Sequence, residues 1–375
     1  MNLVNSEQAA NLVARLAEEA NNAGTFGVGA LLMHRDGRVL KTDRNRVIED
    51  GRLSDPIGHA ERRLVDWYFE TKAEGGRVPP PSECVIITSL DPCIHCTGAL
   101  IAAGFRSISL AADPLAGVFA REDFRCLPTS LRTRARKNFI RFEISDLPRS
   151  EVKNFGFGSA KPTCSSEAFK RATLAFEKSR IAAQLRIAGQ KNDDKRQATT
   201  TKLPYFRRAT EFALKSDSAG HLLLAEFIKE KKASNGEIAA FWDREHNVIV
   251  GAHDQLDKSP IRVALAELVR LYTKLRSTFE LLHPRNCLLL TSHGPGSDAN
   301  ALLTIGAYGS TIETPLNISD RSWVYIYERQ TEASLRKMIS ELPPLYGEMI
   351  HIQPVRVDIE KLAHDHKKTA ALSDA

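Results

Sequence analysis

Three residues with side chains suited to one metal ion occur in two short segments. His59 opens the first segment, with Glu61 two residues later, and Cys93 and Cys96 lie in the second. Zn²⁺ favours tetrahedral sites of imidazole nitrogen and thiolate sulfur, and a site with only three protein ligands keeps a position for water. Because such water loses a proton near neutral pH, a nearby carboxylate can move protons. The pattern predicts one Zn²⁺ per chain, with Glu61 as the proton carrier.

Each of the two segments is expected to begin a helix. A helix from about Gly58 would place His59 in its first turn, and a helix from Cys93 would put Cys93 and Cys96 on one face. The partial positive charge at both helix N-termini would favour thiolate over thiol. Two thiolates would then offset the charge of the ion.

The two motifs, His-Ala-Glu and Pro-Cys-Ile-His-Cys, match the H-x-E and P-C-x-x-C signature of zinc deaminases. The sequence resembles the cytidine deaminase-like superfamily, most closely the branch of tRNA adenosine deaminases, bacterial guanine deaminases and fungal cytosine deaminase. The resemblance covers roughly residues 6–145. Residues 26–32 resemble the first strand of that family, and Asp55-Pro56 precedes the histidine at the usual distance.

The resemblance implies hydrolytic deamination of an amino-substituted nitrogen heterocycle, with release of ammonia. Glu61 would take a proton from the attacking water and return protons to the ring nitrogen and the leaving amine. Asn45 is expected to hydrogen-bond the substrate, and a backbone N–H next to Ala60 or at Cys93 to contribute near the metal. His95, between the two cysteines, has two interpretations, a substrate contact or an exposed residue.

Length and composition indicate a soluble globular protein with two domains. The chain has 375 residues, which is longer than a single hydrophobic core usually supports. Of its residues, 42% are hydrophobic and 26% are charged, as in soluble globular proteins. It has no run of 18 apolar residues that would predict a membrane span, and residues 1–7 lack the pattern of a secretory signal. Six cysteines, two of them in the metal motif, do not suggest a disulfide framework, so a cytoplasmic location is expected.

Hydrophobic periodicity in the first half predicts alternating helices and strands. Asn5 to Gln8 reads as a capping box that starts a helix ending near Asn21. The other predicted elements are strands at 28–33, 39–42, 85–88, 108–111 and 139–144, and helices at 59–72 and 93–103. This alternation indicates a three-layer α/β domain, with a mixed central sheet flanked by helices.

The middle of the chain is basic. Residues 121–190 hold 15 Lys and Arg against 7 Asp and Glu. Such a segment could bind phosphate-bearing substrates or nucleic acid, or it could be a solvated helical linker. A charged helix is predicted at 165–189 and a flexible linker at 190–202. The expected domains are therefore 1–150, a basic helical linker at 151–202, and 203–375.

The second half contains a faint repeat of the first. Residues 56–65 align with 260–269 at five identical positions, and 84–89 align with 287–292. Val263 and Leu265 replace the histidine and the glutamate, and no cysteine follows Pro295 in register. Chance similarity between two buried-strand patterns is the alternative, but the matches recur in order at a near-constant offset. We expect a second tandem deaminase-like domain without metal ligands, which acts as a built-in partner in an internal pseudo-dimer.

The remaining histidines and cysteines lack motif companions. Cys84 and Cys287 lie on predicted buried strands and are expected to be packed thiols. The others are predicted to be structural or without a role: His253, His283, His293, Cys126, Cys164, and His364 and His366 in a polar C-terminal tail.

Three functions follow from these patterns. The first is a zinc deaminase of a small nucleobase or nucleoside, in a chain that could also form a homodimer. The second is a deaminase of tRNA or another polynucleotide, which is supported only by the basic middle segment. The third is a zinc-stabilised regulatory protein without turnover. Structural zinc sites usually recruit four protein ligands, and the free Glu61 then has no purpose, so the first function is favoured.

Overall fold

The fold is that of a computed structural model, which describes part of the chain. The described residues are 1–120, 124–145, 157, 161–197, 206–215, 223, 226, 227, 229, 230, 233–243, 245–279, 281, 283, 284, 287–292, 298–312, 323–325, 337, 340 and 341. His293, His364 and His366, and the predicted linker residues 198–202, lie outside them.

A five-stranded mixed sheet forms the centre of the first half, in the order β2-β1-β5-β6-β7. β1 pairs antiparallel with β2 and β5, whereas β5, β6 and β7 are parallel neighbours. The strands are β1 (Gly29–His34), β2 (Val39–Arg44), β5 (Cys84–Leu90), β6 (Arg106–Ala111) and β7 (Phe139–Arg141). All seven residues of β5 are buried, as expected of a strand covered on both faces.

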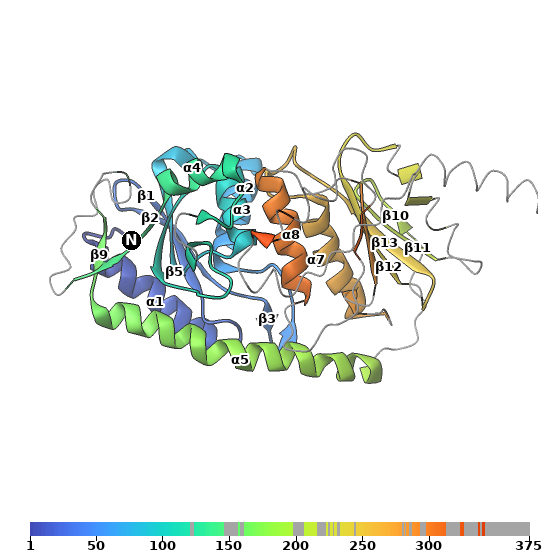
Figure 1. The fold of residues 1–375 in the computed structure, drawn as a ribbon, viewed down its shortest axis with the longest axis horizontal. Helices are drawn as coiled ribbons and strands as arrows, with labels where there is room; N and C mark the ends of the chain where they lie inside the picture. Colours follow the sequence, from blue (N-terminus) through green and yellow to red (C-terminus); the bar gives the residue numbers. More distant parts are fainter. Residues whose placement is uncertain are drawn as a thin grey trace, which may run out of the picture.

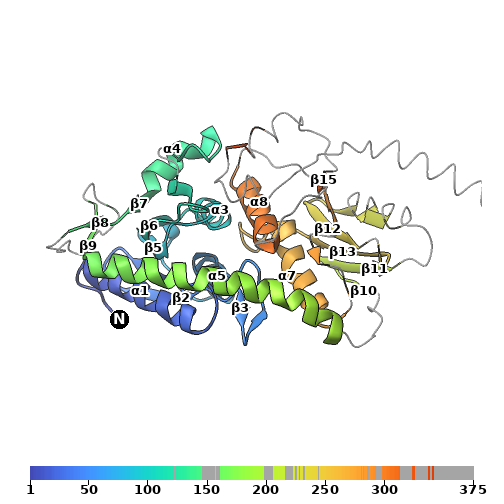
Figure 2. The same cartoon turned by 60° about the horizontal axis from the view of Figure 1, so that its bottom comes forward.

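Helices cover both faces of this sheet. The helices and short elements of the first half are α1 (Ser6–Asn22), β3 (Ile48–Glu49), β4 (Arg52–Leu53), α2 (Ala60–Ala73), η1 (Pro81–Glu83), α3 (Ile94–Ala103), η2 (Val118–Ala120), α4 (Thr129–Asn138), β8 (Glu143–Ile144), β9 (Thr163–Cys164) and α5 (Ser166–Gln197). α1 and α5 lie side by side along one face, and α2 and α3 lie on the other (Figures 1 and 2).

Local sequence explains where these helices begin and end. The side chain of Asn5 accepts a hydrogen bond of 2.9 Å from the backbone N–H of Gln8, which confirms the predicted cap of α1. α3 ends at Gly104, whose φ of 81° is a left-handed conformation that glycine adopts without steric cost.

Two predicted elements differ from the structure. The strand predicted at 139–144 is divided, because β7 pairs with β6 while β8 pairs with β9. The helix predicted to end at Gly189 continues to Gln197 and so includes most of the segment expected to be flexible. The residues beyond Gly189 are polar and lack an apolar rhythm, but they contain nothing that stops a helix.

The second half contains a six-stranded sheet in the order β10-β11-β13-β12-β14-β15. Its elements are β10 (Phe206–Arg207), β11 (Glu211–Lys215), β12 (Ile238–Asp243), β13 (Val248–His253), α7 (Ala264–Arg276), β14 (Leu288–Thr291), α8 (Ala299–Ile312) and β15 (Trp323–Tyr325). The run β13-β12-β14-β15 has the same order and the same strand directions as β2-β1-β5-β6. The two halves therefore share a topology, as the repeat predicted.

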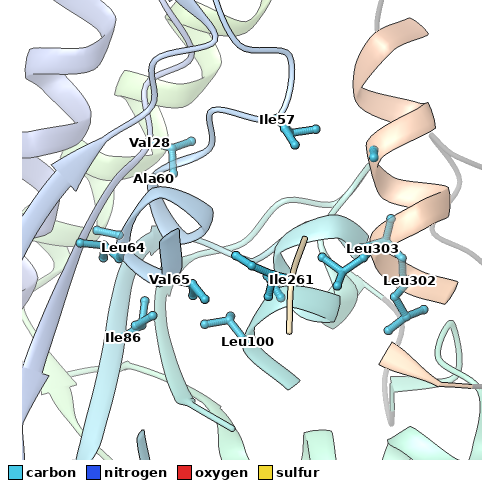
Figure 3. Close-up of a cluster of buried hydrophobic side chains, with 14 of the residues drawn as sticks. Val28, Ile57, Ala60, Leu64, Val65, Ile86, Leu100, Ile261, Leu302 and Leu303 are labelled. Atoms are coloured by element: carbon cyan, nitrogen blue, oxygen red, sulfur yellow. The ribbon is translucent and has the colours of Figure 1, made fainter. Parts of the chain in front are cut away.

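The two halves pack together through their helices. In Figure 1, α2 and α3 of the first half lie toward α7 and α8 of the second half, with the two sheets on the outer sides of these helices, and α3 packs directly against α8. One buried cluster, part of which Figure 3 shows, includes Leu100 of α3, Leu303 of α8, and Ile261, which precedes α7. A Cβ on Gly98 of α3 would lie 2.8 Å from the backbone nitrogen of Leu303. Only glycine therefore allows this close approach of α3 to α8.

The histidines and cysteines that were given no functional role, and that lie within the described residues, are buried or contact a neighbouring side chain. Cys84, Cys126, Cys164 and Cys287 are buried free thiols, and His283 is buried too. His253 lies 3.5 Å from a carboxylate oxygen of Glu230. A search of the described residues found no helix that is both long enough and apolar enough to cross a membrane.

Candidate metal centre

Two helix starts bring the three predicted ligands together. His59 is the N-cap of α2, Cys93 is the N-cap of α3, and Cys96 lies in the first turn of α3. The Nδ1 atom of His59 lies 3.4 Å from each of the two Sγ atoms. With ordinary Zn–S and Zn–N bond lengths, tetrahedral Zn²⁺ separates such donors by about 3.6 Å. The donor set and its spacing therefore fit a zinc site with three protein ligands.

The electrostatics of the two cysteines favour a thiolate. A hydrogen bond from Cys96 and the nearby charge of His59 hold the pKa of the Cys93 thiol well below its ordinary value, against the effect of burial. Burial and the negative charge on Cys93 raise the pKa of Cys96. A thiolate is therefore favoured at Cys93, and a cation bound beside Cys96 would favour a second thiolate there.

Glu61 lies beside these ligands, in the first turn of α2. Its side chain is buried, with one carboxylate oxygen 3.5 Å from the Sγ atom of Cys96. The other oxygen accepts a hydrogen bond of 3.1 Å from the hydroxyl of Thr88 on β5. Burial, followed by the charge of Cys93, raises the pKa of the Glu61 carboxyl. A carboxyl of this kind is suited to take up and release a proton.

Asn45 lies at the same site, just after β2. Its Oδ1 atom accepts hydrogen bonds from the hydroxyl of Thr25 at 2.6 Å and from the backbone N–H of Val47 at 2.9 Å. Because the oxygen is committed to the protein, the amide NH₂ is the end that can donate toward a ligand. Asn45 lines the cavity described below, as the predicted role requires.

A cavity with about 670 Å³ of space, part of it open to solvent, adjoins the three ligands. The lining includes predicted residues and others that the sequence did not indicate, namely Phe26, Val28, Asn45, His59, Glu61, Leu90, Asp91, Cys93, Cys96, Asp113, Leu115, Ala116, Phe176, Arg180 and Gln184. The last three share one face of α5 at intervals of four residues, but only the packing of α5 brings that face to the cavity.

The carboxylates of two acidic residues in the cavity lining already have partners within the protein. Asp91 is paired with Arg141 and accepts a hydrogen bond of 2.8 Å from the hydroxyl of Ser109. Asp113 accepts hydrogen bonds from two successive backbone N–H groups, at 3.0 and 3.1 Å. Burial raises the pKa of both carboxyls. These interactions fix the loop after β6 that forms one wall of the cavity.

His95 does not lie where the sequence suggested. Its side chain is fully buried, so the interpretation as an exposed residue is wrong. One ring nitrogen lies 2.9 Å from the guanidinium of Arg62 and the other 3.0 Å from the carbonyl oxygen of Leu303. Both nitrogens are thus bound to the protein, and the residue is absent from the cavity lining, so a substrate contact gains no support. Ala60 is also fully buried, at the start of α2.

The corresponding helix start in the second half carries no ligand. Val263 is the N-cap of α7, with backbone angles of −69° and 151° that match the −71° and 148° of His59. This equivalence agrees with the alignment of 56–65 with 260–269. Among the described residues, the cluster of His59, Cys93 and Cys96 is the one group of His, Cys, Asp or Glu with metal-ligand spacing.

One protein-family model matches part of the first half of the chain. Residues 4–112 match the family model for the cytidine and deoxycytidylate deaminase zinc-binding region. The match includes all three candidate ligands, Glu61 and Asn45.

Two curated proteins are similar to part of this chain. A tRNA(Ile)-lysidine synthase of Deinococcus radiodurans is 34% identical over 103 residues, and a probable cytosine deaminase of Schizosaccharomyces pombe is 28% identical over 92 residues. These matches cover 27% and 24% of this chain. They cover only 16% of the synthase and 51% of the deaminase.

Similar solved structures include a protein from a study of tRNA:A34 deaminases and a guanine deaminase from Nitrosomonas europaea. The first is 27% identical, covers 30% of this chain and 80% of its own, and has a TM-score of 0.25. The second is 16% identical, covers 48% of this chain and 87% of its own, and has a TM-score of 0.30.

Proposed function

We propose that this protein is a zinc-dependent hydrolytic deaminase of an amino-substituted nitrogen heterocycle, such as a nucleobase or nucleoside, because residues 4–112 match the family model for the cytidine and deoxycytidylate deaminase zinc-binding region. The observation that carries the proposal is a carboxylate oxygen of Glu61 lying 3.5 Å from the Sγ atom of Cys96, next to two further ligands and an open cavity. A purely structural zinc site has no need of that carboxylate.

His59, Cys93 and Cys96 would hold the metal. When bound there, Zn²⁺ supplies a Lewis acid that makes water a nucleophile near neutral pH. Glu61 would take the proton of the attacking water at its carboxylate and deliver protons to the ring nitrogen and to the leaving amine. Thr88 holds one Glu61 oxygen in place, which leaves the other to exchange the proton.

Other groups would bind and orient the substrate. The amide NH₂ of Asn45 would donate to an acceptor of the ring, because its oxygen is bonded to Thr25 and Val47. Phe26, Val28 and Leu90 supply apolar surface against the flat heterocycle and exclude water from the reacting carbon. The site would thus combine one proton carrier with a largely apolar cavity.

The relatives act on different substrates, as their names state: cytosine in one case and guanine in another. A panel of bases, nucleosides and nucleotides is therefore the direct test. We expect about one zinc per chain by metal analysis and release of ammonia from at least one member of the panel. Bound zinc with no ammonia from any compound would favour a regulatory zinc protein instead.

The variant Glu61→Gln tests the proposed role of the carboxylate. It keeps the size and the hydrogen-bonding capacity of the side chain but cannot carry the proton. We expect ammonia release to fall by at least about a thousandfold, with zinc content unchanged. Wild-type activity in this variant would rule out Glu61 as the proton carrier.

A polynucleotide substrate is a second candidate. α4 presents several exposed cationic side chains, among them Arg134, Arg136 and Lys137. Phosphate contacts release counterions, so binding of tRNA through such a surface would weaken steeply with salt. Binding of unfractionated tRNA at 50 and 200 mM salt distinguishes this candidate from a small-molecule deaminase.

We also propose that the second half is an internal partner that has lost its metal site. Support comes from the shared strand order and from the replacement of the helix-start histidine by Val263. Its α7 and α8 pack against the two helices that carry the metal ligands. The second half would therefore hold α2 and α3 in place.

A further inference from the structure

We propose that Arg180 and Gln184 of α5 form a subsite for an anionic group on the substrate, so that the heterocycle carries a phosphate monoester or a carboxylate. The inference rests on the proposed function, since it names the class of substrate that the same cavity would accept. It also assigns a role to a helix that lies outside the matched residues 4–112.

Three side chains of α5 form one wall of the cavity. Phe176, Arg180 and Gln184 are spaced four residues apart, so they lie on one face of the helix along about 12 Å of its length. Glu61 and the three ligands line the same cavity. A ligand that fills the cavity would therefore meet the metal site at one wall and α5 at another.

Arg180 is half-buried, and within the part of the chain that the structure describes it forms no ion pair or hydrogen bond. The three carboxylates in the cavity lining are otherwise engaged. Asp91 pairs with Arg141, Asp113 accepts hydrogen bonds from backbone N–H groups, and Glu61 accepts one from the hydroxyl of Thr88. A guanidinium facing a cavity in this state is suited to bind an oxyanion through two parallel hydrogen bonds.

Gln184 lies one turn further along and also has no hydrogen bond among the described residues. Its amide adds a donor beside the guanidinium, and Phe176 adds apolar surface on the other side. The wall thus offers a hydrophobic face for a ring or sugar, then a cation, then an amide donor. This order suits a substrate with an oxyanion beyond its ring.

Contacts with α1 and with the start of the first sheet hold this wall in place. The hydroxyl of Ser179, next to Arg180, accepts a hydrogen bond of 2.6 Å from the backbone N–H of Gly27. Arg171 makes two hydrogen bonds to the carboxylate of Glu18 on α1, at 2.8 and 2.6 Å. Because these contacts fix the backbone of α5 before a ligand arrives, less entropy is lost on binding than if the helix had to be ordered.

Calorimetric titration of the zinc-loaded protein tests the subsite without requiring turnover. Ligands are compared in matched pairs that differ by the anion: adenosine with AMP, guanosine with GMP, cytidine with CMP, and cytosine with 5-carboxycytosine. In at least one pair we expect the anionic member to bind at least about tenfold more tightly, as one charged hydrogen-bonded contact allows. The nucleotide pairs and the carboxylate pair distinguish the two sources of the anion.

Variants then locate the preference. Arg180→Ala is expected to reduce the affinity ratio of the preferred pair roughly 10- to 100-fold. Lys178→Ala removes a charge from the exposed side of the same helix and should leave the ratio unchanged. Arg180→Gln, which keeps a polar side chain of similar length, serves as a second variant if the alanine variant does not fold.

Specific results would overturn the inference. They are the absence of a preference in every pair, a preference that survives both changes at Arg180, or tighter binding of a dinucleotide without a terminal phosphate than of any monophosphate. A preference that depends on Arg180 in a protein that releases no ammonia would refute the proposed function alone.

Discussion

At the scale of single residues, the site depends on groups whose roles differ although they lie within a few ångströms. His59, Cys93 and Cys96 have donor atoms at zinc-ligand separations, while Glu61 is held by Thr88 with one oxygen left toward the metal site. Burial raises the pKa of Glu61 and so adapts it to proton transfer. The distinction between ligand and proton carrier is therefore set by position and not by residue type.

The ligand assignment makes a prediction for the cysteines. Cys96→Ser replaces a thiolate with a hydroxyl, a much weaker zinc ligand, so zinc content should fall well below one per chain after dialysis. Cys164→Ser is the matched control, because Cys164 is equally buried but remote from the ligand cluster. Metal analysis of both variants provides the measurement. Full zinc retention by the Cys96 variant would remove this residue from the ligand set.

At the scale of elements, α5 reaches the cavity because a glycine allows it to pack closely against the start of the first sheet. A Cβ on Gly27 would overlap the carbonyl oxygen of Ala175 on α5. Neither Gly27 nor Ala175 has a side-chain functional group that would mark it as part of a site in the sequence. The approach of the two backbones nevertheless determines that α5 forms a wall of the cavity.

Gly27→Ala is therefore expected to push α5 outward. Overpacking of this kind costs about 1–3 kcal/mol of the free energy of unfolding, and denaturant titration would measure the loss. The binding of any cavity ligand should weaken as well, since Arg180 moves with its helix. Lys178→Ala is again the control on α5. An unchanged stability and affinity in Gly27→Ala would show that the two backbones are not in close contact.

At the scale of the whole molecule, half-buried charges join the two halves. Arg270 of α7 lies 3.0 Å from an oxygen of Asp55 and 2.6 Å from an oxygen of Asp66 on α2. Asp66 is also 3.2 Å from Arg62, and Arg62 contacts His95. Arg270 of the second half is thus connected, through the side chains of Asp66 and Arg62, to α3, the helix that begins next to Cys93 and contains Cys96.

Removing the charge of Arg270 should weaken the joined structure. Arg270→Met leaves two partly buried carboxylates without their partner, at a cost of about 2 kcal/mol at pH 7. Lys274→Met, one turn along α7 at an exposed position, is the control. Urea unfolding followed at several pH values is the measurement. Equal stability of the two variants would contradict a structural role for this contact between the halves.

The pH dependence of that loss has a definite sign. Burial alone would raise the pKa of Asp66, but Arg62 and Arg270 outweigh it and hold the value below the ordinary 3.8. A carboxyl with a lowered folded-state pKa contributes stability above pH 3.8, and the contribution disappears as the pH falls through the folded-state value. The difference between Arg270→Met and the wild type should therefore shrink in acid.

The sequence by itself determined the candidate metal centre. A zinc site with a proton carrier requires specific side chains at close spacing, so His59, Glu61, Cys93 and Cys96 could be proposed for these roles from residue type and spacing alone. The central strands were also predictable, because buried strands are continuous apolar runs bounded by turn residues. The repeat likewise predicted the shared strand order of the second half.

Only the tertiary structure decided what surrounds that chemistry. The burial of His95 results from the packing of α8, some 200 residues further along the chain, as its hydrogen bond to Leu303 shows. The placement of Arg180 results from the close approach of α5 to Gly27. Long-range packing depends on the combined shapes of many side chains and leaves no local pattern at either partner.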